Sequence, residues 1–154
     1  MKYTTLLIFA TLLLISCGNS KNAANSEKSD ETENTTPSAK KAILSQDIAK
    51  FRDTESYNIK SINLEGNILE LNITYSGGCA NHEFELVGSA FITKSLPPKR
   101  IVQLYHHKNT DDCRELVHET LYFDISDFAY QNSEIIISLQ HFPESFRYTK
   151  VVEE

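Results

Sequence analysis

Cysteine and histidine residues gather in two short stretches of this sequence. Residues 76–86 read Ser-Gly-Gly-Cys-Ala-Asn-His-Glu-Phe-Glu-Leu and contain Cys79 and His82. Residues 106–113 read His-His-Lys-Asn-Thr-Asp-Asp-Cys and end at Cys113. Such side chains form disulfides, ligate zinc and carry out nucleophilic chemistry. We therefore expect the fold to bring the two stretches together.

A disulfide between Cys79 and Cys113 is the first interpretation. If strands over residues 82–92 and 101–107 pair around a turn centred on Leu96, the two cysteines lie the same number of residues from that turn. Directly opposed residues of an antiparallel pair have Cα atoms ~4.5–5.5 Å apart, which a disulfide accepts. The chain-entropy model gives such a crosslink about 4 kcal/mol of stabilisation.

A free or redox-active cysteine pair is one alternative, and a metal site is another. Cys79-x-x-His82 has the spacing of a ligand pair, and zinc accepts cysteine, histidine and aspartate. Further ligands stand in the second stretch: His106, His107, Asp111, Asp112 and Cys113. However, the register that opposes the cysteines places His82 opposite Thr110 and several residues from His106. His82 also shares strand parity with Phe84, so a histidine at the mouth of the core explains it as well.

Motifs of catalysis are absent from the sequence. It has no Gly-rich phosphate loop, no Gly-x-Ser-x-Gly elbow and no His-Glu-x-x-His. A blue-copper site is excluded because no histidine precedes Cys79 and Met1 is the only methionine. Nothing in the sequence assembles a nucleophile with a base. We therefore predict a protein that is not an enzyme and has no cofactor.

The N-terminus is a targeting segment. Lys2 precedes an apolar run over residues 6–15, which is shorter than the ~20 residues that span a bilayer. The run ends in Leu14-Ile15-Ser16-Cys17, which resembles the lipobox of bacterial lipoproteins. The resemblance implies cleavage of a signal peptide, residues 1–16, and anchoring to a lipid bilayer through acylated Cys17. An ordinary secretory signal with an incidental cysteine is the alternative.

Lipidation also accounts for the cysteine count. Of three cysteines, it takes Cys17 and leaves Cys79 and Cys113 as an even pair. Cysteine pairs in an oxidising compartment form disulfides, so this favours the disulfide over the metal site. We expect the protein in the bacterial cell envelope, on the periplasmic side of the outer membrane rather than at the cell surface.

The lipidated cysteine begins a tether over residues 17–40. After Cys17 this segment contains no Leu, Ile, Val, Phe or Tyr, so it cannot bury enough apolar surface to order itself. The globular domain is predicted over residues 41–154. The chain's formal net charge of −6 disfavours binding to nucleic acid, which usually requires a basic face.

Hydrophobic periodicity predicts an all-β domain. Ile43, Leu44, Ile48 and Phe51 have helical spacing, which predicts one short N-terminal helix over residues 40–55. Alternation of period two follows and predicts strands over residues 57–64, 68–75, 82–92, 101–107, 116–124, 134–141 and 147–152. We therefore expect a mainly antiparallel sandwich or barrel-like domain of about seven strands.

Three local features refine this arrangement. A parity slip near Ser61 indicates a β-bulge in the first strand. The pair Gly77–Gly78 predicts positive φ or a close backbone approach where the second strand ends. The fourth strand is apolar on both sides, which predicts a central position in its sheet.

The paired motifs Gly-Gly-Cys79-x-x-His82-x-Phe84 and His106-x6-Cys113 resemble those of small, uncharacterised bacterial envelope lipoproteins. The resemblance covers about residues 60–125 and implies a location but no activity. The preferred hypothesis is a membrane-anchored lipoprotein whose disulfide-stapled β domain is a binding or structural module, with an unknown protein or small molecule as partner. The alternative is a periplasmic, zinc-type metal-binding protein.

Overall fold

A computed structural model describes residues 38–51 and 56–152 of the chain. The predicted signal peptide, the lipidation site Cys17 and the tether as far as residue 37 lie outside the described residues. The end of the predicted tether is described, and Lys40 there already belongs to a strand. The globular part therefore includes at least one residue before the predicted boundary at 41.

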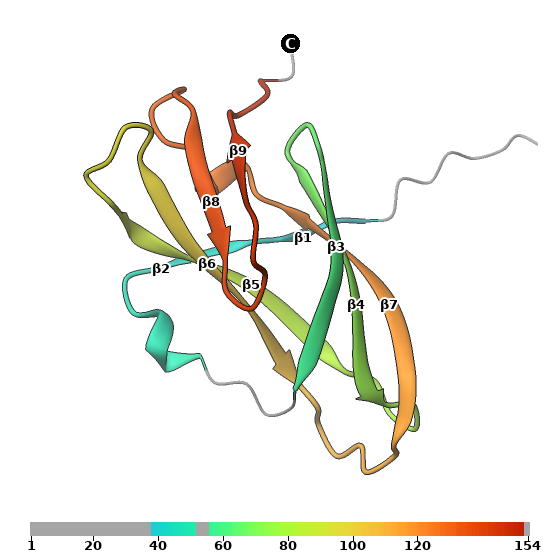
Figure 1. The fold of residues 1–154 in the computed structure, drawn as a ribbon. Helices are drawn as coiled ribbons and strands as arrows, with labels where there is room; N and C mark the ends of the chain where they lie inside the picture. The colour runs from blue at the N-terminus through green and yellow to red at the C-terminus, as the bar shows by residue number, and fades with distance from the viewer. Residues whose placement is uncertain (1–37, 52–55, 153–154) are drawn as a thin grey trace, which may run out of the picture. The chain divides into compact units, whose positions relative to one another are not determined.

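The described residues contain nine strands arranged in two sheets (Figure 1). The first sheet has the order β1 (Lys40–Lys41), β7 (Glu115–Asp124), β4 (Ile68–Gly77) and β3 (Tyr57–Glu65). The second has the order β2 (Ile43–Ser45), β5 (Glu83–Ile92), β6 (Lys99–His107), β8 (Ile135–Leu139) and β9 (Ser145–Tyr148).

Both sheets are mixed. The pairs β1–β7, β2–β5 and β6–β8 are parallel, and the other neighbouring strands are antiparallel. The all-β prediction is confirmed, with parallel pairs that it did not foresee. The sheets do not close into a barrel. The seven predicted strands correspond to β3–β9, and β1 and β2 are additional.

One hydrophobic core lies between the sheets. From β4 it takes Leu69, Leu71 and Ile73, at most 1% exposed, as the alternation predicted. From β6 it takes Val102 and Leu104, which are fully buried. Burying each such side chain stabilises the fold by roughly 1.5–3 kcal/mol. The strand β6 lies between β5 and β8, so its predicted central position is confirmed.

The predicted N-terminal helix is wrong. Its described residues, 40–51, form β1 and β2 followed by a single 3-10 turn, η1 (Ile48–Lys50), and its last four residues lie outside the described residues. Between the strands Ala42 is buried, and its N–H donates to the carbonyl of Asp124 at 2.9 Å. The segment passes from one sheet to the other and adds a short edge strand to each (Figure 1). Pairing with β7 and β5 therefore outweighs the helical spacing of the apolar residues. One of those residues, Leu44, remains 40% exposed.

The predicted β-bulge is confirmed, and two turns complete the local structure. The register of β3 on β4 shifts between Ile59 and Ser61, where the parity slip predicted a bulge. The hairpin between β3 and β4 turns at Gly66, whose φ is +58°. After β7 the chain forms a second 3-10 turn, η2 (Ser126–Phe128), and the Phe128 side chain is fully buried in the core.

The predicted register between the third and fourth strands is wrong. In the β5–β6 ladder Phe84 pairs with His106, because the register shifts between Gly88 and Ile92. Beyond this irregularity each residue of β5 pairs two positions away from the β6 residue expected from equal spacing around Leu96. Instead, the β4–β7 ladder opposes the cysteines, since its last pair, Gly77 and Glu115, lies two residues from each.

Candidate functional site

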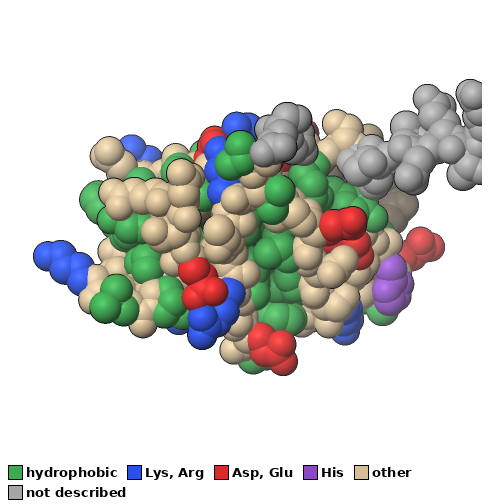
Figure 2. Space-filling view, turned by 90° about the horizontal axis from the view of Figure 1, so that it is seen from above, with side chains coloured by type: hydrophobic (Ala, Val, Ile, Leu, Met, Phe, Trp, Pro, Cys, Tyr) green, Lys and Arg blue, Asp and Glu red, His purple; other side chains and the backbone are tan. Residues whose placement is uncertain are grey.

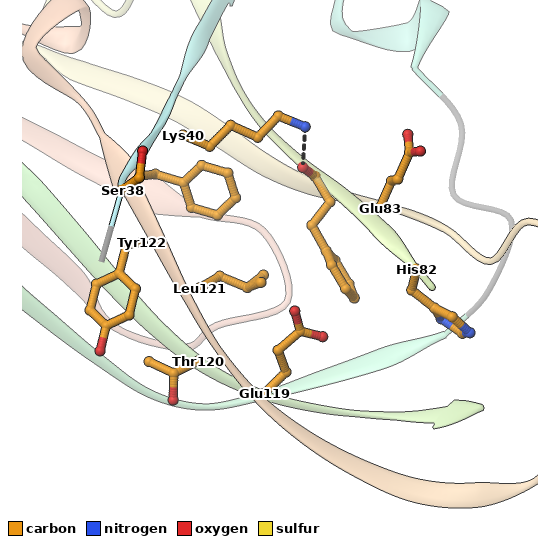
Figure 3. A pocket seen from close by; sticks show the side chains of 10 residues that line it. Ser38, Lys40, His82, Glu83, Glu119, Thr120, Leu121 and Tyr122 are labelled. Carbon is orange, nitrogen blue, oxygen red and sulfur yellow. Dashed lines mark hydrogen bonds between the residues drawn. The ribbon is translucent and has the colours of Figure 1, made fainter. Parts of the chain in front are cut away.

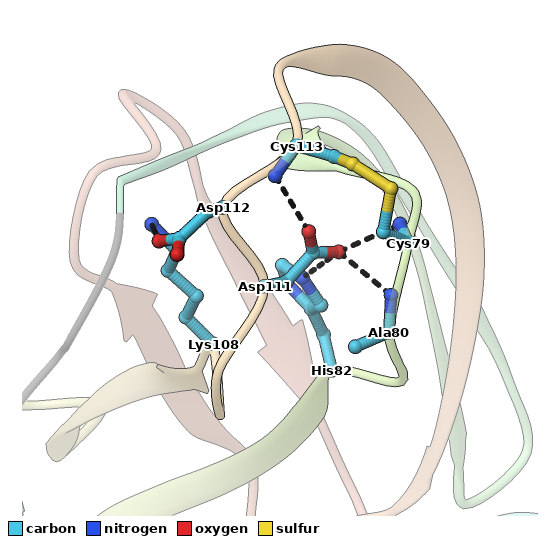
Figure 4. Close-up of a disulfide and its surroundings, with 7 residues drawn as sticks. All are labelled: Cys79, Ala80, His82, Lys108, Asp111, Asp112 and Cys113. Carbon is cyan, nitrogen blue, oxygen red and sulfur yellow. Dashed lines mark hydrogen bonds and ion pairs between the residues drawn. A yellow bond between two sulfur atoms is a disulfide. The ribbon is translucent and has the colours of Figure 1, made fainter.

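A disulfide joins Cys79 and Cys113 at the end of the β4–β7 ladder (Figure 4). Their Cα atoms are 5.7 Å apart, and 34 positions separate them in sequence. Gly78, with φ of +110°, turns the chain out of β4 just before Cys79. The predicted disulfide is confirmed, although other strands than those expected position it.

Asp111 lies beneath this disulfide and is 1% exposed. Its Oδ2 accepts the backbone N–H groups of Cys79 and Ala80, each at 2.9 Å. Its Oδ1 accepts the N–H of Cys113 at 2.8 Å. One carboxylate therefore binds the backbone on both sides of the disulfide (Figure 4).

The same hydrogen bonds keep Asp111 ionised. The N–H groups of Ala80 and Cys113 are the largest causes that hold the pKa of this carboxyl well below its usual range. The N–H of Cys79 and the ring of His82 lower the pKa further, while burial opposes them. A carboxylate that accepts several N–H groups is stabilised in its charged form even without contact with water.

His82 continues the network into the core. Its Nε2 lies 3.1 Å from Asp111 Oδ2, and its Nδ1 lies 2.6 Å from His106 Nε2. The side chains of His82 and Asp111 are inaccessible to solvent, and His106 is fully buried. Since a carboxylate only accepts, a neutral His82 donates from Nε2 and accepts from His106 at Nδ1. Both nitrogens of His82 are thus engaged within the protein.

Aromatic rings surround the two histidines. His106 stacks on Phe84 with ring centroids 4.4 Å apart, and Tyr75 lies 4.5 Å from His82. The Tyr75 hydroxyl donates to Glu119 Oε2 at 2.7 Å. Burial, followed by this hydrogen bond, raises the pKa of Tyr75 well above its usual range. These residues connect the histidine network with β7.

Gly77 makes the close approach that the glycine pair predicted. A Cβ at this position would lie 2.6 Å from His82 Nε2 and 3.1 Å from Asp111 Oδ2. A side chain at residue 77 would therefore displace the ring or the carboxylate.

The structure brings together five of the seven residues considered as metal ligands: Cys79, His82, His106, Asp111 and Cys113. The expectation that His82 lies several residues from His106 is wrong, because it rested on the incorrect register. His107 is excluded, since it lies 3.5 Å from Glu85 on the other side of β6. Asp112 is fully exposed. Among the described residues its ion-pair partner is Lys108, whose Nζ lies 3.9 Å from Asp112 Oδ1.

The ligand atoms of Cys79, Asp111 and Cys113 lie within 4.8 Å of one another. The two sulfur atoms are joined in the disulfide, however, and both oxygens of Asp111 accept backbone N–H groups. In the oxidised protein these groups are therefore already engaged.

A groove of about 430 Å³ opens beside this network, between β5 and β7 (Figure 3). His82, Phe84 and Leu121 contribute to its wall, and Glu119 brings a carboxylate to it, whereas the Glu83 side chain points away from the groove (Figure 3). Lys40 crosses one side, where its Nζ donates to the carbonyl of Phe84 at 2.8 Å. The groove and the roles of Glu119 and Lys40 were not predictable, because nothing in the sequence indicates that β5 and β7 lie near the margins of their sheets.

Figure 2 shows one face of the described surface without a large area of a single charge. Hydrophobic side chains form a central strip on this face, and charged residues of both signs are scattered around it.

No helix within the described ranges is long and apolar enough to cross a membrane.

Comparisons with known proteins identify a shared fold but no family. No protein-family model and no curated protein matches the chain. A NigD-like immunity protein from Bacteroides caccae is similar in structure, with a TM-score of 0.52 and 15% identity over 72% of this chain and 63% of that one. A protein of unknown function, DUF1344, from Bacteroides vulgatus gives a TM-score of 0.51 and 15% identity over 74% and 57%. This chain therefore spans less than two thirds of either neighbour, and the likeness establishes a shared two-sheet fold.

Proposed function

We propose that the protein is a lipoprotein of the bacterial cell envelope, anchored by acylated Cys17, whose β domain is a binding module without catalytic activity. The Cys79–Cys113 disulfide carries this proposal. Disulfides persist in oxidising compartments, which supports export of the chain. The disulfide also leaves Cys17, at the end of the lipobox-like pattern, as the remaining cysteine of the three.

The binding role is supported by the contrast between the internally bonded residues of the site and the open groove beside them. Asp111 and His82 are committed to internal hydrogen bonds, which favours a structural task for them. The groove beside them is open and is lined by both apolar and acidic side chains. An immunity role, by analogy with the neighbour called NigD-like, would be one form of such binding.

Replacing Cys17 tests the anchor. Cys17→Ser should move the protein from the membrane fraction to the soluble fraction, or leave the precursor unprocessed, because the acylated residue is lost. Cys79→Ser is the control, since it removes a cysteine but retains Cys17. A Cys17→Ser protein that fractionates and migrates like the wild type would refute the lipoprotein assignment.

Site-specific photo-crosslinking in intact cells tests the binding role. A photoreactive residue is placed in turn at exposed positions on different parts of the surface: Glu83, Phe91, Lys94, His118 and Glu144. Reproducible adducts with a partner protein at neighbouring positions support a binding module. Absence of adducts at all positions would leave the structural role as the explanation of this domain.

Metal binding is the second candidate, favoured by the proximity of Cys79, Asp111 and Cys113. It requires both thiols in the reduced state, since thiolate is the form that ligates metal. Thiol counting and elemental analysis of protein purified from its own envelope distinguish the two functions. No thiol at residues 79 and 113 and no bound metal support the disulfide-stapled module, whereas two thiols with one metal support the alternative.

A further inference from the structure

Most of the outer edge of β7 is not paired with another strand in the described part of the chain. On one side β7 pairs along its whole length with β4, from Glu115 to Asp124. On the other side β1 pairs only at Phe123 and Asp124. One backbone edge of residues 115–122 is therefore uncovered by any described strand, and residues 119–122 of this stretch line the groove.

The hydrogen bond between Ala42 and Asp124 identifies the backbone groups at this edge. The Asp124 carbonyl accepts the Ala42 N–H at 2.9 Å, so residue 124 directs its backbone groups towards β1. Backbone groups alternate between the two edges of a strand, and the β4–β7 ladder has no register shift. The residues that direct their N–H and C=O groups to the open edge are therefore Leu116, His118, Thr120 and Tyr122.

The neighbouring strand shows how an edge is closed in this protein. On β5 the parallel strand β2 covers Val87–Ser89, and the Lys40 ammonium donates a hydrogen bond to the carbonyl of Phe84. Edge strands that carry such protection are poor templates for another strand. At residues 116–122 no lysine or other side chain of the described residues forms a hydrogen bond to the backbone edge. Leu116, at the start of this edge, is 68% exposed.

The side chains beside the open edge define a complementary segment. Leu121 and Phe84 form apolar wall in the groove, and Glu119 adds an acidic group. Successive side chains of a strand point to opposite faces, so an added strand would place every second side chain towards the groove. Apolar residues would suit its walls, and a basic residue would suit the Glu119 carboxylate, in a chain of net charge −6.

We propose that the open edge of β7 binds an extended, basic segment of a partner protein, which adds as a strand along residues 116–122. Main-chain hydrogen bonds would supply affinity, and alternate side chains in the groove would supply specificity. The inference rests on the proposed binding role and adds its location and its partner's chemistry, but it does not depend on the lipid anchor.

Hydrogen exchange of the full-length protein in detergent tests the proposal. The probe is the peptide acetyl-Lys-Val-Lys-Val-Lys-Val-Lys-amide, and NMR reports exchange of each backbone amide. Without peptide, the amides of residues 116, 118, 120 and 122 should exchange fast, while odd-numbered amides of β7 are protected by β4. With peptide, the even-numbered amides should gain at least about tenfold protection, because each acquires a hydrogen-bond partner.

Two control peptides separate strand addition from charge attraction. The first replaces lysine by glutamate and should not bind, because it meets Glu119 in a chain of net charge −6. The second is N-methylated at every residue, which keeps the charge but removes the N–H donors, and it should not protect the edge. Equal protection by the N-methylated peptide would overturn the proposal.

A matched pair of variants gives an independent measurement. His118→Pro removes an N–H that faces the open edge and places a ring there, without removing a bond to β4. It should weaken peptide affinity at least about tenfold, since backbone hydrogen bonds at the edge are lost. His118→Val keeps the N–H and should bind as the wild type does. Equal affinity of both variants would overturn the proposal, and the exchange measurement decides if His118→Pro does not fold.

Other occupants of the edge give different results. Even-numbered amides that are already protected in a peptide-free dimer indicate a second copy of the chain, and protection in a monomer indicates an upstream segment of the same chain. Either result overturns the partner assignment. In the crosslinking experiment above, adducts at Lys94 or Glu144 but none at His118 or Glu83 would support a binding module and reject this edge.

Discussion

At the scale of single residues, Asp111 organises the site more than either histidine does. Its carboxylate accepts three backbone N–H groups, from Cys79, Ala80 and Cys113, and also contacts His82. A disulfide fixes only the positions of two sulfur atoms. The carboxylate additionally fixes the directions of the backbone around them, because each N–H must point towards its oxygens.

Replacing Asp111 by asparagine should lower the stability of the domain at neutral pH. The neutral amide is a weaker acceptor, and its NH₂ group faces donors. The control is Asp112→Asn, the adjacent aspartate, which is fully exposed and should behave as the wild type does. Denaturant unfolding at pH 7 measures the difference, and equal unfolding midpoints for the two variants would contradict the role assigned to Asp111.

The pH dependence of this effect has a definite sign. The pKa of Asp111 is lowered in the folded protein, so its contribution is present above the unfolded pKa of about 3.9 and is lost as the pH falls. The difference between the wild type and Asp111→Asn should therefore be constant near neutrality and shrink below about pH 4. A difference that grows on acidification would show that another group is responsible.

The cysteine pairing could be predicted from the sequence, but the role of Asp111 could not. The lipobox-like pattern takes Cys17 and leaves two cysteines to pair. Asp111 stood in a polar loop, where such residues usually form turns, and its burial depends on how closely Gly77 approaches the loop. The link between His82 and His106 was missed for a related reason, since a two-residue register error separates side chains that are in contact.

At the scale of the elements, Gly88 couples the irregularity in β5 to η2. A Cβ at residue 88 would lie 2.7 Å from the ring of Phe128, so the ring packs directly on the β5 backbone. Arg100, 4% exposed, donates from Nε to the Phe128 carbonyl at 3.0 Å and also donates to the Ser89 carbonyl. The irregular part of the β5–β6 ladder is thus filled by one ring and one guanidinium group.

Gly88→Ala should destabilise the domain by about 1–3 kcal/mol, the usual effect of an added methyl group in a packed core. The ring must move, and the Phe128 carbonyl that Arg100 contacts moves with it. A double-mutant cycle with Phe128→Leu gives the test, because a smaller side chain should reduce the effect of the added methyl group. Equal destabilisation in both backgrounds would show that the ring contact is not the cause.

Elements were predictable where the local pattern and the fold agree. In β4 the buried residues Leu69, Leu71 and Ile73 alternate with more exposed ones, and both pairing partners preserve that alternation. The segment before η1 was not predictable in this way. Its strands contain two and three residues, too few for a period, and they exist only because β7 and β5 offer edges to pair with.

At the scale of the whole molecule, the disulfide connects more than its two loops. The chain between Cys79 and Cys113 contains all of β5 and β6, two of the three central strands of the second sheet, while the disulfide itself extends the first sheet. Reduction would open the loop that the disulfide closes in the unfolded chain, and this loop includes strands of the second sheet. The loss of stability should therefore appear in the unfolding of the whole domain.

Unfolding of the full-length protein with a reductant or a chelator separates the disulfide from the metal alternative. Cys113→Ala, the double replacement of Cys79 and Cys113, and the reduced wild type should each lose about 2–5 kcal/mol, because each lacks the same bond. His107→Ala should change stability by no more than about 0.5 kcal/mol, since its described ion pair is partly exposed. A chelator should leave the wild type unchanged. Metal bound by these residues would reverse that pattern, with a chelator destabilising the protein.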